Sequence, residues 1–458
     1  MPPRLADVNP PGAVAPTPVR REILRLAVPA FLALVAEPLF LLADSAIIGH
    51  LGTVPLAGLG VASAVLLTAA GVFVFLAYGT TSIVARQLGA GSPRGAISAG
   101  IDGLWLALLL GAVTALVVAL TAPALCRAFG AAADVQEQAV TYLRISAAGI
   151  PGMLVVLAVT GVLRGLQDTR TPLVAAVTGF GANILLNLVF VYQFHWGIAG
   201  SAWGTVIAQT GMAVGLFTVV LRRAVEAGAR LSLHPTGVLT AAVGGVPLLV
   251  RTLALRAVLL VTTAVAARSG TETLAGHQIA LTVWSFLAFS LDALAIAAQA
   301  ITGRALGAGD REAARDAART MARWGLGAGI ATGVLVLALS QVIARAFTSD
   351  PGVIGAAAGA FVVIALVQWL AGYVFVIDGV LMGAGDTRWL AVAMVMAVAV
   401  WVPAILWAAR GPGVLPGAGG AELAALWVWF GAGFMALRGI GLWWRFRSDA
   451  WLVTGATR

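Results

Sequence analysis

The chain carries one sequence pattern twice, at a constant separation. Residues 161–170 read Gly-Val-Leu-Arg-Gly-Leu-Gln-Asp-Thr-Arg and residues 379–388 read Gly-Val-Leu-Met-Gly-Ala-Gly-Asp-Thr-Arg, an offset of 379 − 161 = 218. The same offset relates further pairs: Arg86 and Arg304, residues 88–91 and 306–309, and Val28-Pro29 and Val246-Pro247. A constant offset over this length predicts two copies of one fold unit with no net insertion between them.

The composition favours a protein that lies in lipid. Hydrophobic residues make up 60% of the chain and charged residues 10%, and the mean hydropathy is +0.97. So few charges cannot cover the surface of a water-soluble protein. Because repeat-built membrane carriers place their substrate path between the repeats, the duplication predicts a transporter.

The formal net charge of +9 comes from 28 basic residues, and every one is an arginine. They concentrate in short segments between apolar blocks, which indicates membrane topology and not a nucleic-acid surface. The single cysteine, Cys126, excludes an internal disulfide and a cysteine-cluster metal site, and the four histidines show no ligand spacing. We therefore expect no nucleic-acid partner, no metal and no cofactor.

Apolar blocks long enough to cross a bilayer, which takes about 20 residues, recur along the chain. We expect twelve spans: residues 22–48, 58–85, 96–122, 137–163, 171–192, 198–222, 240–268, 276–302, 316–346, 354–382, 388–409 and 421–444. Six spans per repeat is an even number, so both copies face the same way and a pseudo-twofold axis along the membrane normal relates them. The expected fold is therefore all-α and integral to the membrane, with two six-helix lobes. Its parts are a disordered tail (1–20), the first lobe (21–222), a linker (223–238), the second lobe (239–447) and a tail (448–458).

The arginines beside the spans predict the orientation. With the N-terminus in the cytoplasm, most loop arginines lie inside, among them Arg86, Arg164 and Arg304. The outer loops then hold four: Arg127, Arg268, Arg345 and Arg410. We expect both termini, and therefore both tails, on the cytoplasmic side.

Ionisable groups within spans are functional candidates, because each costs a few kcal/mol in lipid unless it is paired or hydrated. The first span carries Glu37 and Asp44, which are seven residues apart and therefore on one helix face, about 10 Å apart along the axis. The fifth span carries Asn183 and Asn187, four apart and again on one face. We expect these side chains to line a cavity in the first lobe. The alternative is that the two acids only hold helices together or lie near the membrane surface.

The second lobe has buried charges of its own in Arg256, Asp292 and Asp378, with Arg251 nearby in the same span as Arg256. We expect Arg256, Asp292 and Asp378 to approach within the distance of a salt bridge or a single water, since an unpaired charge in a span is costly. Such a network favours a structural role, with a second coupling or substrate site as the alternative.

Several motifs resemble one transporter family. Residues 41–52 (Leu-Leu-Ala-Asp-Ser-Ala-Ile-Ile-Gly-His-Leu-Gly) are similar to the first-helix signature of multidrug and toxic compound extrusion (MATE) transporters. Residues 275–279, 291–299 and 303–310 resemble the DinF branch of that family. The resemblance covers nearly everything after residue 20 and implies twelve spans in two lobes. It also implies export of organic cations and drugs in exchange for protons or sodium ions. No ATP-binding G-x-x-x-x-G-K-[ST] run is present.

The resemblance also implies roles for individual residues. Asp44 matches the essential aspartate of the first helix, and Phe40 lies where members often have tyrosine. Pro29 matches the proline at which that helix bends, and Asn183 matches a family asparagine. Asn187 stands where better-known members carry a second aspartate, so this chain departs from a two-aspartate proton site and leaves Asp44, helped by Glu37, as the titrating group.

Three classes of function fit such a chain: a cation-coupled antiporter, a lipid-linked-precursor flippase of the same superfamily, and an integral membrane enzyme. A flippase should place cationic side chains in its cavity to hold a diphosphate, whereas the first lobe offers acids and amides. Intramembrane catalysis needs a clustered His/Asp, Ser/His or metal constellation, and the sequence shows none.

We therefore expect a secondary active transporter and not an enzyme. It exports cationic, amphiphilic drugs or metabolites by alternating access. The proton is the expected coupling ion and sodium the alternative, since one aspartate and two amides form a thin cage for a hard cation. The expected partners are small organic cations and the lipid bilayer, for a monomer in a bacterial plasma (inner) membrane.

Overall fold

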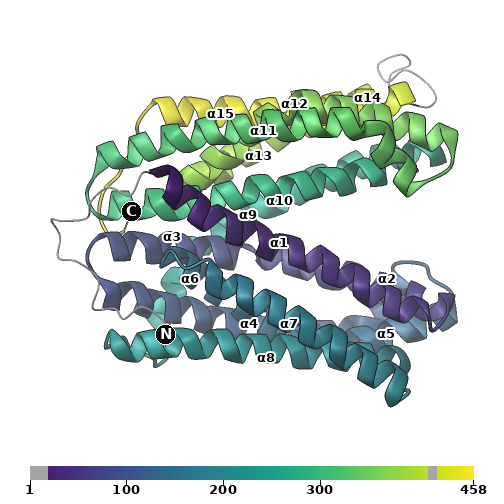
Figure 1. Cartoon of the computed structure of the whole chain (residues 1–458), viewed down its shortest axis with the longest axis horizontal. Helices are drawn as coiled ribbons and strands as arrows, with labels where there is room; N and C mark the ends of the chain where they lie inside the picture. The colour runs from purple at the N-terminus through teal and green to yellow at the C-terminus, as the bar shows by residue number, and fades with distance from the viewer. Residues whose placement is uncertain (1–18, 411–419, 458) are drawn as a thin grey trace.

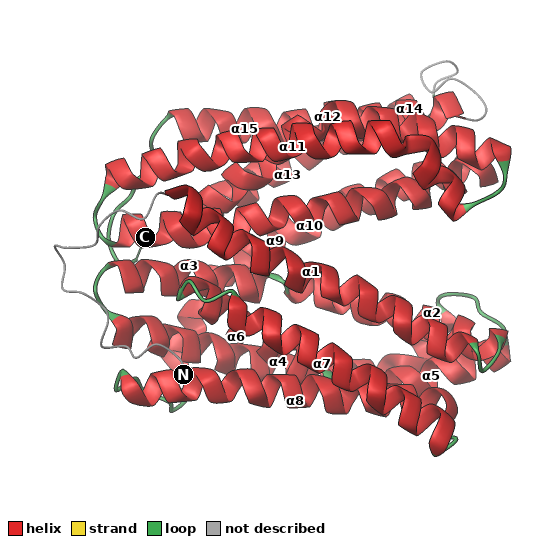
Figure 2. Cartoon of the chain, viewed as in Figure 1, coloured by secondary structure: helices red, strands yellow, loops and turns green. Residues whose placement is uncertain are grey.

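The computed structural model describes residues 19–410 and 420–457. Within these residues the chain consists of long helices joined by short loops and has no β-strand (Figure 1, Figure 2). By length and hydropathy, 11 helices can cross a membrane, or up to 12 when a bent pair counts as one span. The expected all-α membrane fold with twelve spans is confirmed. The tail expected at residues 1–20 lies outside the described residues, apart from its last two.

The spans follow the chain in order. The first half consists of α1 (Val19–Gly49), α2 (Thr53–Phe73), α3 (Phe75–Gly89), α4 (Pro93–Arg127), α5 (Ala133–Ala147), α6 (Ile150–Gly165), α7 (Arg170–Leu188) with the π-helical turn η2 (Val189–Gln193), and α8 (Gly197–Glu226). The second half consists of α9 (Pro235–Arg268), α10 (Thr271–Gly307), α11 (Arg311–Phe347), α12 (Pro351–Gly383), α13 (Thr387–Ala408), and α14 (Gly420–Val428) with η3 (Trp429–Phe434) and α15 (Met435–Arg447).

Two of the spans expected to be continuous are interrupted. The second span is formed by α2 and α3, which meet at Val74. In the fourth span, α5 and α6 meet at an angle of 52°. Pro151 stands in the first turn of α6, where its ring removes a backbone N–H and clashes with a continuing helix, which accounts for this kink.

The two halves form two lobes, and their contact keeps the symmetry of the repeat. Gly89, at the end of α3, packs on the backbone of Arg304 in α10, and Gly307, at the end of α10, packs on the backbone of Arg86 in α3. A methyl group at either glycine would overlap that backbone. Because 89 + 218 = 307 and 86 + 218 = 304, each contact is the image of the other. The pseudo-twofold axis therefore runs between α3 and α10.

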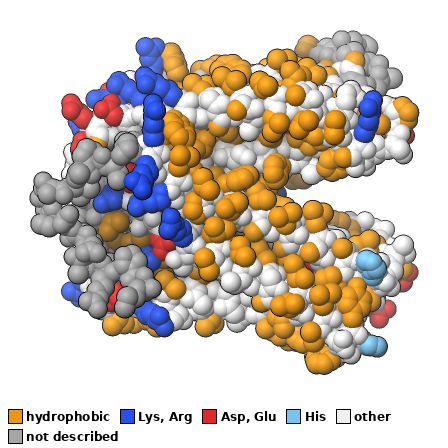
Figure 3. Space-filling view, viewed as in Figure 1, with side chains coloured by type: hydrophobic (Ala, Val, Ile, Leu, Met, Phe, Trp, Pro, Cys, Tyr) orange, Lys and Arg blue, Asp and Glu red, His pale blue; other side chains and the backbone are white. Residues whose placement is uncertain are grey.

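The lobes touch at one end of the molecule and separate at the other. Figure 3 shows a deep cleft between them, open at the end opposite most of the arginines. We call the closed end, formed by the turns after α3, α6, α10 and α12 and by the last residues of the chain, the arginine-rich end (Figure 1). The other is the open end. The structure is therefore one state of a two-lobed protein that is accessible from one side.

Two connecting segments differ from expectation. The linker expected at 223–238 is shorter, since α8 continues to Glu226 and α9 begins at Pro235. The described residues after α15, part of the tail expected at 448–458, pack on the arginine-rich end, where Trp451 and Leu452 are buried.

Candidate functional site

Asp44 lies in the first lobe, one and a half turns before the end of α1, and only 3% of its surface is exposed. Its Oδ1 accepts hydrogen bonds from Asn187 Nδ2 and from Ser201 Oγ, each at 2.7 Å. The hydroxyl of Tyr142 lies 3.4 Å from its Oδ2. The donors come from α7, α8 and α5, so four helices meet at one carboxylate, and all three donors are neutral.

Close packing of α7 on α8 completes this cluster. Asn183, one turn before Asn187, donates from Nδ2 to Thr205 Oγ1 at 3.0 Å and does not bond Asp44. Gly204 of α8 lies against the Asn187 side chain, and a methyl group there would overlap Asn187 Oδ1. A glycine at position 204 of the facing helix therefore leaves the space that the Asn187 side chain occupies.

Two acceptor atoms in this cluster have no protein donor. Among the described residues, the buried Oδ1 atoms of Asn183 and Asn187 make no hydrogen bond. A buried acceptor without a protein donor is costly, and ordered water, an ion or a ligand can satisfy it. The two amides therefore leave unused acceptor capacity in the cluster around Asp44.

The other residues expected on α1 have different surroundings. Phe40 is buried and stacks on Phe180 of α7, with ring centroids 5.0 Å apart. Glu37 is exposed at the surface of the chain, although it lies on the same helix face as the buried Phe40 and Asp44. Helix α1 runs unbroken through Pro29, which is partly buried, so the bend expected at that proline is not a helix break here.

The second lobe contains a different arrangement around Asp378, which is 4% exposed. Its carboxylate is paired with Arg251 of α9, whose Nε lies 3.4 Å from Oδ1. Arg438 of α15 donates from Nη2 to Oδ2 at 3.1 Å. Asp292 is partly buried and forms no salt bridge within the described residues, although it interacts electrostatically with Arg251 and Arg438. The second lobe thus neutralises its buried acid with two permanent cations.

The expectation that Arg256 belongs to this network is wrong. Arg256 is exposed, and its guanidinium lies against Gly71 of α2, across the gap between the lobes. Five residues along a helix turn a side chain by about 140°. Arg251 and Arg256 therefore cannot face the same carboxylate, and the network selects Arg251.

Sequence reasoning missed Ser201, Tyr142, Thr205 and Arg438. A signal for the first and third was present: Ser201 and Thr205 are four residues apart on α8, as Asn183 and Asn187 are on α7. Two polar pairs of the same spacing on adjacent spans predict facing hydrogen-bonded stripes. Arg438 could have been found as an arginine in the last span.

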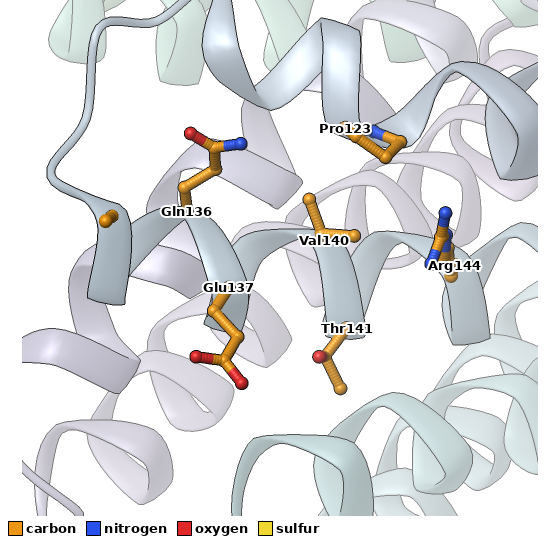
Figure 4. Close-up of a pocket in the computed structure, with 7 residues that line it drawn as sticks. Pro123, Gln136, Glu137, Val140, Thr141 and Arg144 are labelled. Carbon is orange, nitrogen blue, oxygen red and sulfur yellow. The ribbon is translucent and has the colours of Figure 1, made fainter.

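A separate groove of about 390 Å³ lies between α4 and α5 (Figure 4). It is lined by Pro123, Ala133, Gln136, Glu137, Val140, Thr141 and Arg144. Tyr142 and the other Asp44 partners do not take part in it, so the groove is separate from the site. Within the described residues, no group of three His, Cys, Asp or Glu side chains could hold a metal ion.

Sequence comparison finds the duplication again. The profile of the MatE family matches residues 29–189 and, a second time, residues 247–406. The two matches begin 247 − 29 = 218 residues apart, which is the offset of the repeat. The chain belongs to the MatE family. The resemblance expected from its motifs is confirmed.

Curated relatives of this MatE chain include the DNA damage-inducible protein F of Escherichia coli (strain K12), 30% identical over 330 residues, with 71% of this chain and 72% of that protein covered. Protein DETOXIFICATION 44, chloroplastic, of Arabidopsis thaliana is 31% identical over 351 residues, with 73% of this chain and 66% of that protein covered. The chain spans just under two thirds of the length of this relative and of protein DETOXIFICATION 45.

A further relative is named as a multidrug resistance protein, and similar solved structures are named as transporters. The probable multidrug resistance protein NorM of Thermotoga maritima is 25% identical over 362 residues, 77% of each chain. Among solved structures, a MOP superfamily transporter from Pyrococcus furiosus superposes with a TM-score of 0.83 at 22% identity, with 94% of this chain and 96% of that chain covered. A MATE crystal structure in the bent conformation has a TM-score of 0.85 at 22% identity, with the same coverage. These names are those of a multidrug resistance protein, a transporter and a MATE protein, and none of them is that of an enzyme.

Proposed function

We propose that this protein is a proton-coupled antiporter that exports cationic, amphiphilic small molecules by alternating access. One observation carries the proposal: Asp44 is a buried carboxylate whose hydrogen-bond partners are all neutral. No salt bridge to Asp44 exists among the described residues. A carboxylate in that setting is free to exchange its charge with a proton or with a bound cation.

The orientation is part of the proposal. The arginine-rich end faces the cytoplasm by the positive-inside rule. Both termini then lie on the cytoplasmic side of the plasma membrane, and the cleft in Figure 3 opens to the outside. A proton then enters from the open end and neutralises Asp44. The carboxylate loses its hold on a cationic substrate, which leaves outward. Return of the proton to the cytoplasm restores the charge and the site.

The side chains around Asp44 support these steps. Asn187 and Ser201 hold Oδ1 in place in either charge state, because an amide and a hydroxyl do not titrate. Glu37, exposed on the same face of α1, provides an acid on the way to Asp44. The substrate is a small organic cation with an apolar body, because the site offers negative charge next to Phe40.

Sodium is the second candidate ion, and the two donor-free amide oxygens of Asn183 and Asn187 favour it. Together with Asp44 they could supply oxygen ligands to a hard cation. A lipid-linked-precursor flippase is less well supported. Arg251 and Arg438 are held by Asp378, so they are not available to bind a diphosphate.

The test is transport by Asp44→Asn in proteoliposomes, with a fluorescent lipophilic cation as substrate and a trapped pH dye as proton reporter. We expect the variant to insert normally and to lose substrate-driven proton flux. Asp316→Asn, an exposed acid at the arginine-rich end, is the matched control and should transport as the parent does. Export that follows a sodium gradient without proton flux would replace the proton by sodium. Full pH-driven export by Asp44→Asn would contradict the proposal.

A further inference from the structure

The last residues of the chain form a segment seated on the arginine-rich end, residues 449–457, which we call the C-terminal strap. Trp451 is fully buried and stacks on Phe446 of α15, with ring centroids 5.5 Å apart. Its indole Nε1 donates to the Phe446 carbonyl at 3.1 Å. A fully buried tryptophan fixes the start of the strap firmly to the second lobe.

Polar contacts hold the strap along its length. Arg315 of α11 forms a salt bridge with Asp449 at 2.7 Å, and Arg311 donates from Nε to the Leu452 carbonyl at 2.9 Å. The amide of Gly455 donates to the Leu306 carbonyl of α10 at 3.0 Å. All of these partners belong to the second lobe, so the strap moves with that lobe.

The strap also reaches the first lobe. Arg86 of α3 donates from Nη2 to the Val453 carbonyl at 2.8 Å and from Nη1 to the Ala384 carbonyl, in the repeated turn of the second lobe, at 3.0 Å. One buried guanidinium therefore joins α3 to both the strap and the turn after α12. A forked, permanently charged side chain is well suited to such a double contact.

The surface beneath the strap is the closed contact between the lobes. Arg304, the repeat mate of Arg86, donates to Gln167 Oε1 in the repeated turn of the first lobe at 2.5 Å. Ser82 of α3 donates to the Met382 carbonyl at 2.7 Å. Opening this end requires α3 to leave α10, and Arg86 then has to give up the strap as well as the turn.

We propose that the C-terminal strap is a latch that stabilises the closed arginine-rich end and thereby sets the balance between the two access states. The proposal rests on the alternating access proposed above. Because its anchor is entirely on the second lobe, the releasable contacts are those that Arg86 makes with the carbonyls of Val453 and Thr457. A strap that adds contacts only in the closed state shifts the equilibrium toward that state in proportion to their strength.

The test measures conformation and not transport. Phe129 and Phe347 are repeat mates, since 129 + 218 = 347, and they are exposed at the open ends of α4 and α11. Spin labels at Phe129→Cys and Phe347→Cys, in a Cys126→Ala background, report the width of the cleft by pulsed electron resonance. The parent should give a long distance, and closing the open end should shorten it.

We expect deletion of everything after Ser448 to raise the population with the short distance roughly tenfold. Trp451→Ala, which removes the anchor and keeps the chain length, should shift it in the same direction. Trp407→Ala removes an exposed tryptophan elsewhere and should leave the distances unchanged. Unchanged distances in a folded Trp451→Ala variant would overturn the latch. If Asp44→Asn keeps full export while the strap variants shift the distances, the transport proposal fails and the latch stands.

Discussion

Asp44 in the first lobe and Asp378 in the second are both buried carboxylates in a duplicated scaffold, and their partners differ in kind. Asp44 is held by an amide and two hydroxyls, whereas Asp378 is held by two arginines. Neutral donors stabilise a carboxylate without fixing its charge, while paired cations make loss of that charge costly. The surroundings of Asp44 in the first lobe therefore allow its carboxylate to lose its charge, whereas those of Asp378 in the second lobe keep its carboxylate ionised.

The repeat shows why the second lobe lacks the first lobe's site. At the offset of 218, Asp44 corresponds to Thr262, Asn183 to Trp401 and Asn187 to Ile405. Trp401 and Ile405 are fully buried, and the Trp401 indole donates to the Trp429 carbonyl at 2.7 Å. Large apolar side chains thus fill the space that polar groups occupy in the first lobe. The two copies therefore share their backbone contacts between helices and differ in the side chains that fill their interiors.

The largest expected effect on stability comes from breaking the charge balance of the second lobe. Arg438→Ala leaves Asp378 with one cation in place of two and should lower the free energy of unfolding by about 3–5 kcal/mol. Thermal unfolding in detergent micelles measures this. Arg256→Ala, which removes an exposed arginine without an ion pair among the described residues, should change stability by at most about 0.5 kcal/mol. Equal losses in the two variants would contradict the assignment of Arg438.

A smaller effect is expected from crowding the first lobe's site. Gly204→Ala pushes a methyl group onto Asn187 Oδ1, and overpacking of this kind costs about 1–3 kcal/mol. Gly211→Ala lies on the same helix with open space around it and is the matched control, which should be neutral or slightly stabilising. Thermal unfolding and cation export in proteoliposomes should both separate the two variants. If Gly204→Ala exports as well as Gly211→Ala does, the position of Asn187 is not critical.

The smallest effect is expected at Asp168, in a turn that recurs in both lobes. Burial acts to raise the pKa of the Asp168 carboxyl, but hydrogen bonds from Thr171 and the ion pair with Arg223 outweigh it and hold the pKa below its usual value. A lowered pKa in the folded state contributes stability above the unfolded pKa of about 3.9, and this is lost as the pH falls through the lower folded value.

Asp168→Asn should therefore cost about 1 kcal/mol at neutral pH, and the difference from the parent should shrink once the pH falls below about 4. Thermal unfolding at several pH values measures it. Asp386→Asn, in the corresponding turn of the second lobe, where Asp386 pairs with Arg445, is the matched change. A difference that stays constant down to pH 3 would show that the ion pair is not its source.

The sequence alone predicted the twelve spans, the two lobes and their axis, because hydropathy and a constant offset are properties of whole segments. It also predicted that Asp44 and Asn187 line one cavity, because spacings of seven residues (Glu37 and Asp44) and four residues (Asn183 and Asn187) each select one helix face. It could not choose between Arg251 and Arg256, since that choice depends on how α9 is rotated against α12.

Ser201 repeats with Thr205 the four-residue spacing of Asn183 and Asn187, so that pattern could have found it. Tyr142 carries no charge and has no such partner, so nothing in the sequence separates it from ordinary polar residues in spans. The position of the strap depends on a tertiary contact of Trp451 and has no local signal.

The paired contacts of Gly89 and Gly307 also bear on the origin of the fold. In each, a glycine of one half packs on the backbone of the arginine that lies three residues before its own mate in the other half. That is the geometry of an isologous interface, in which the same patch meets itself across a twofold axis. A half-length ancestor with these residues could have associated as a symmetric dimer before the two copies were joined. After fusion, each copy could change independently, so the interior of one half could become polar. The contact between α3 and α10 remained constrained, because both halves contribute residues to it.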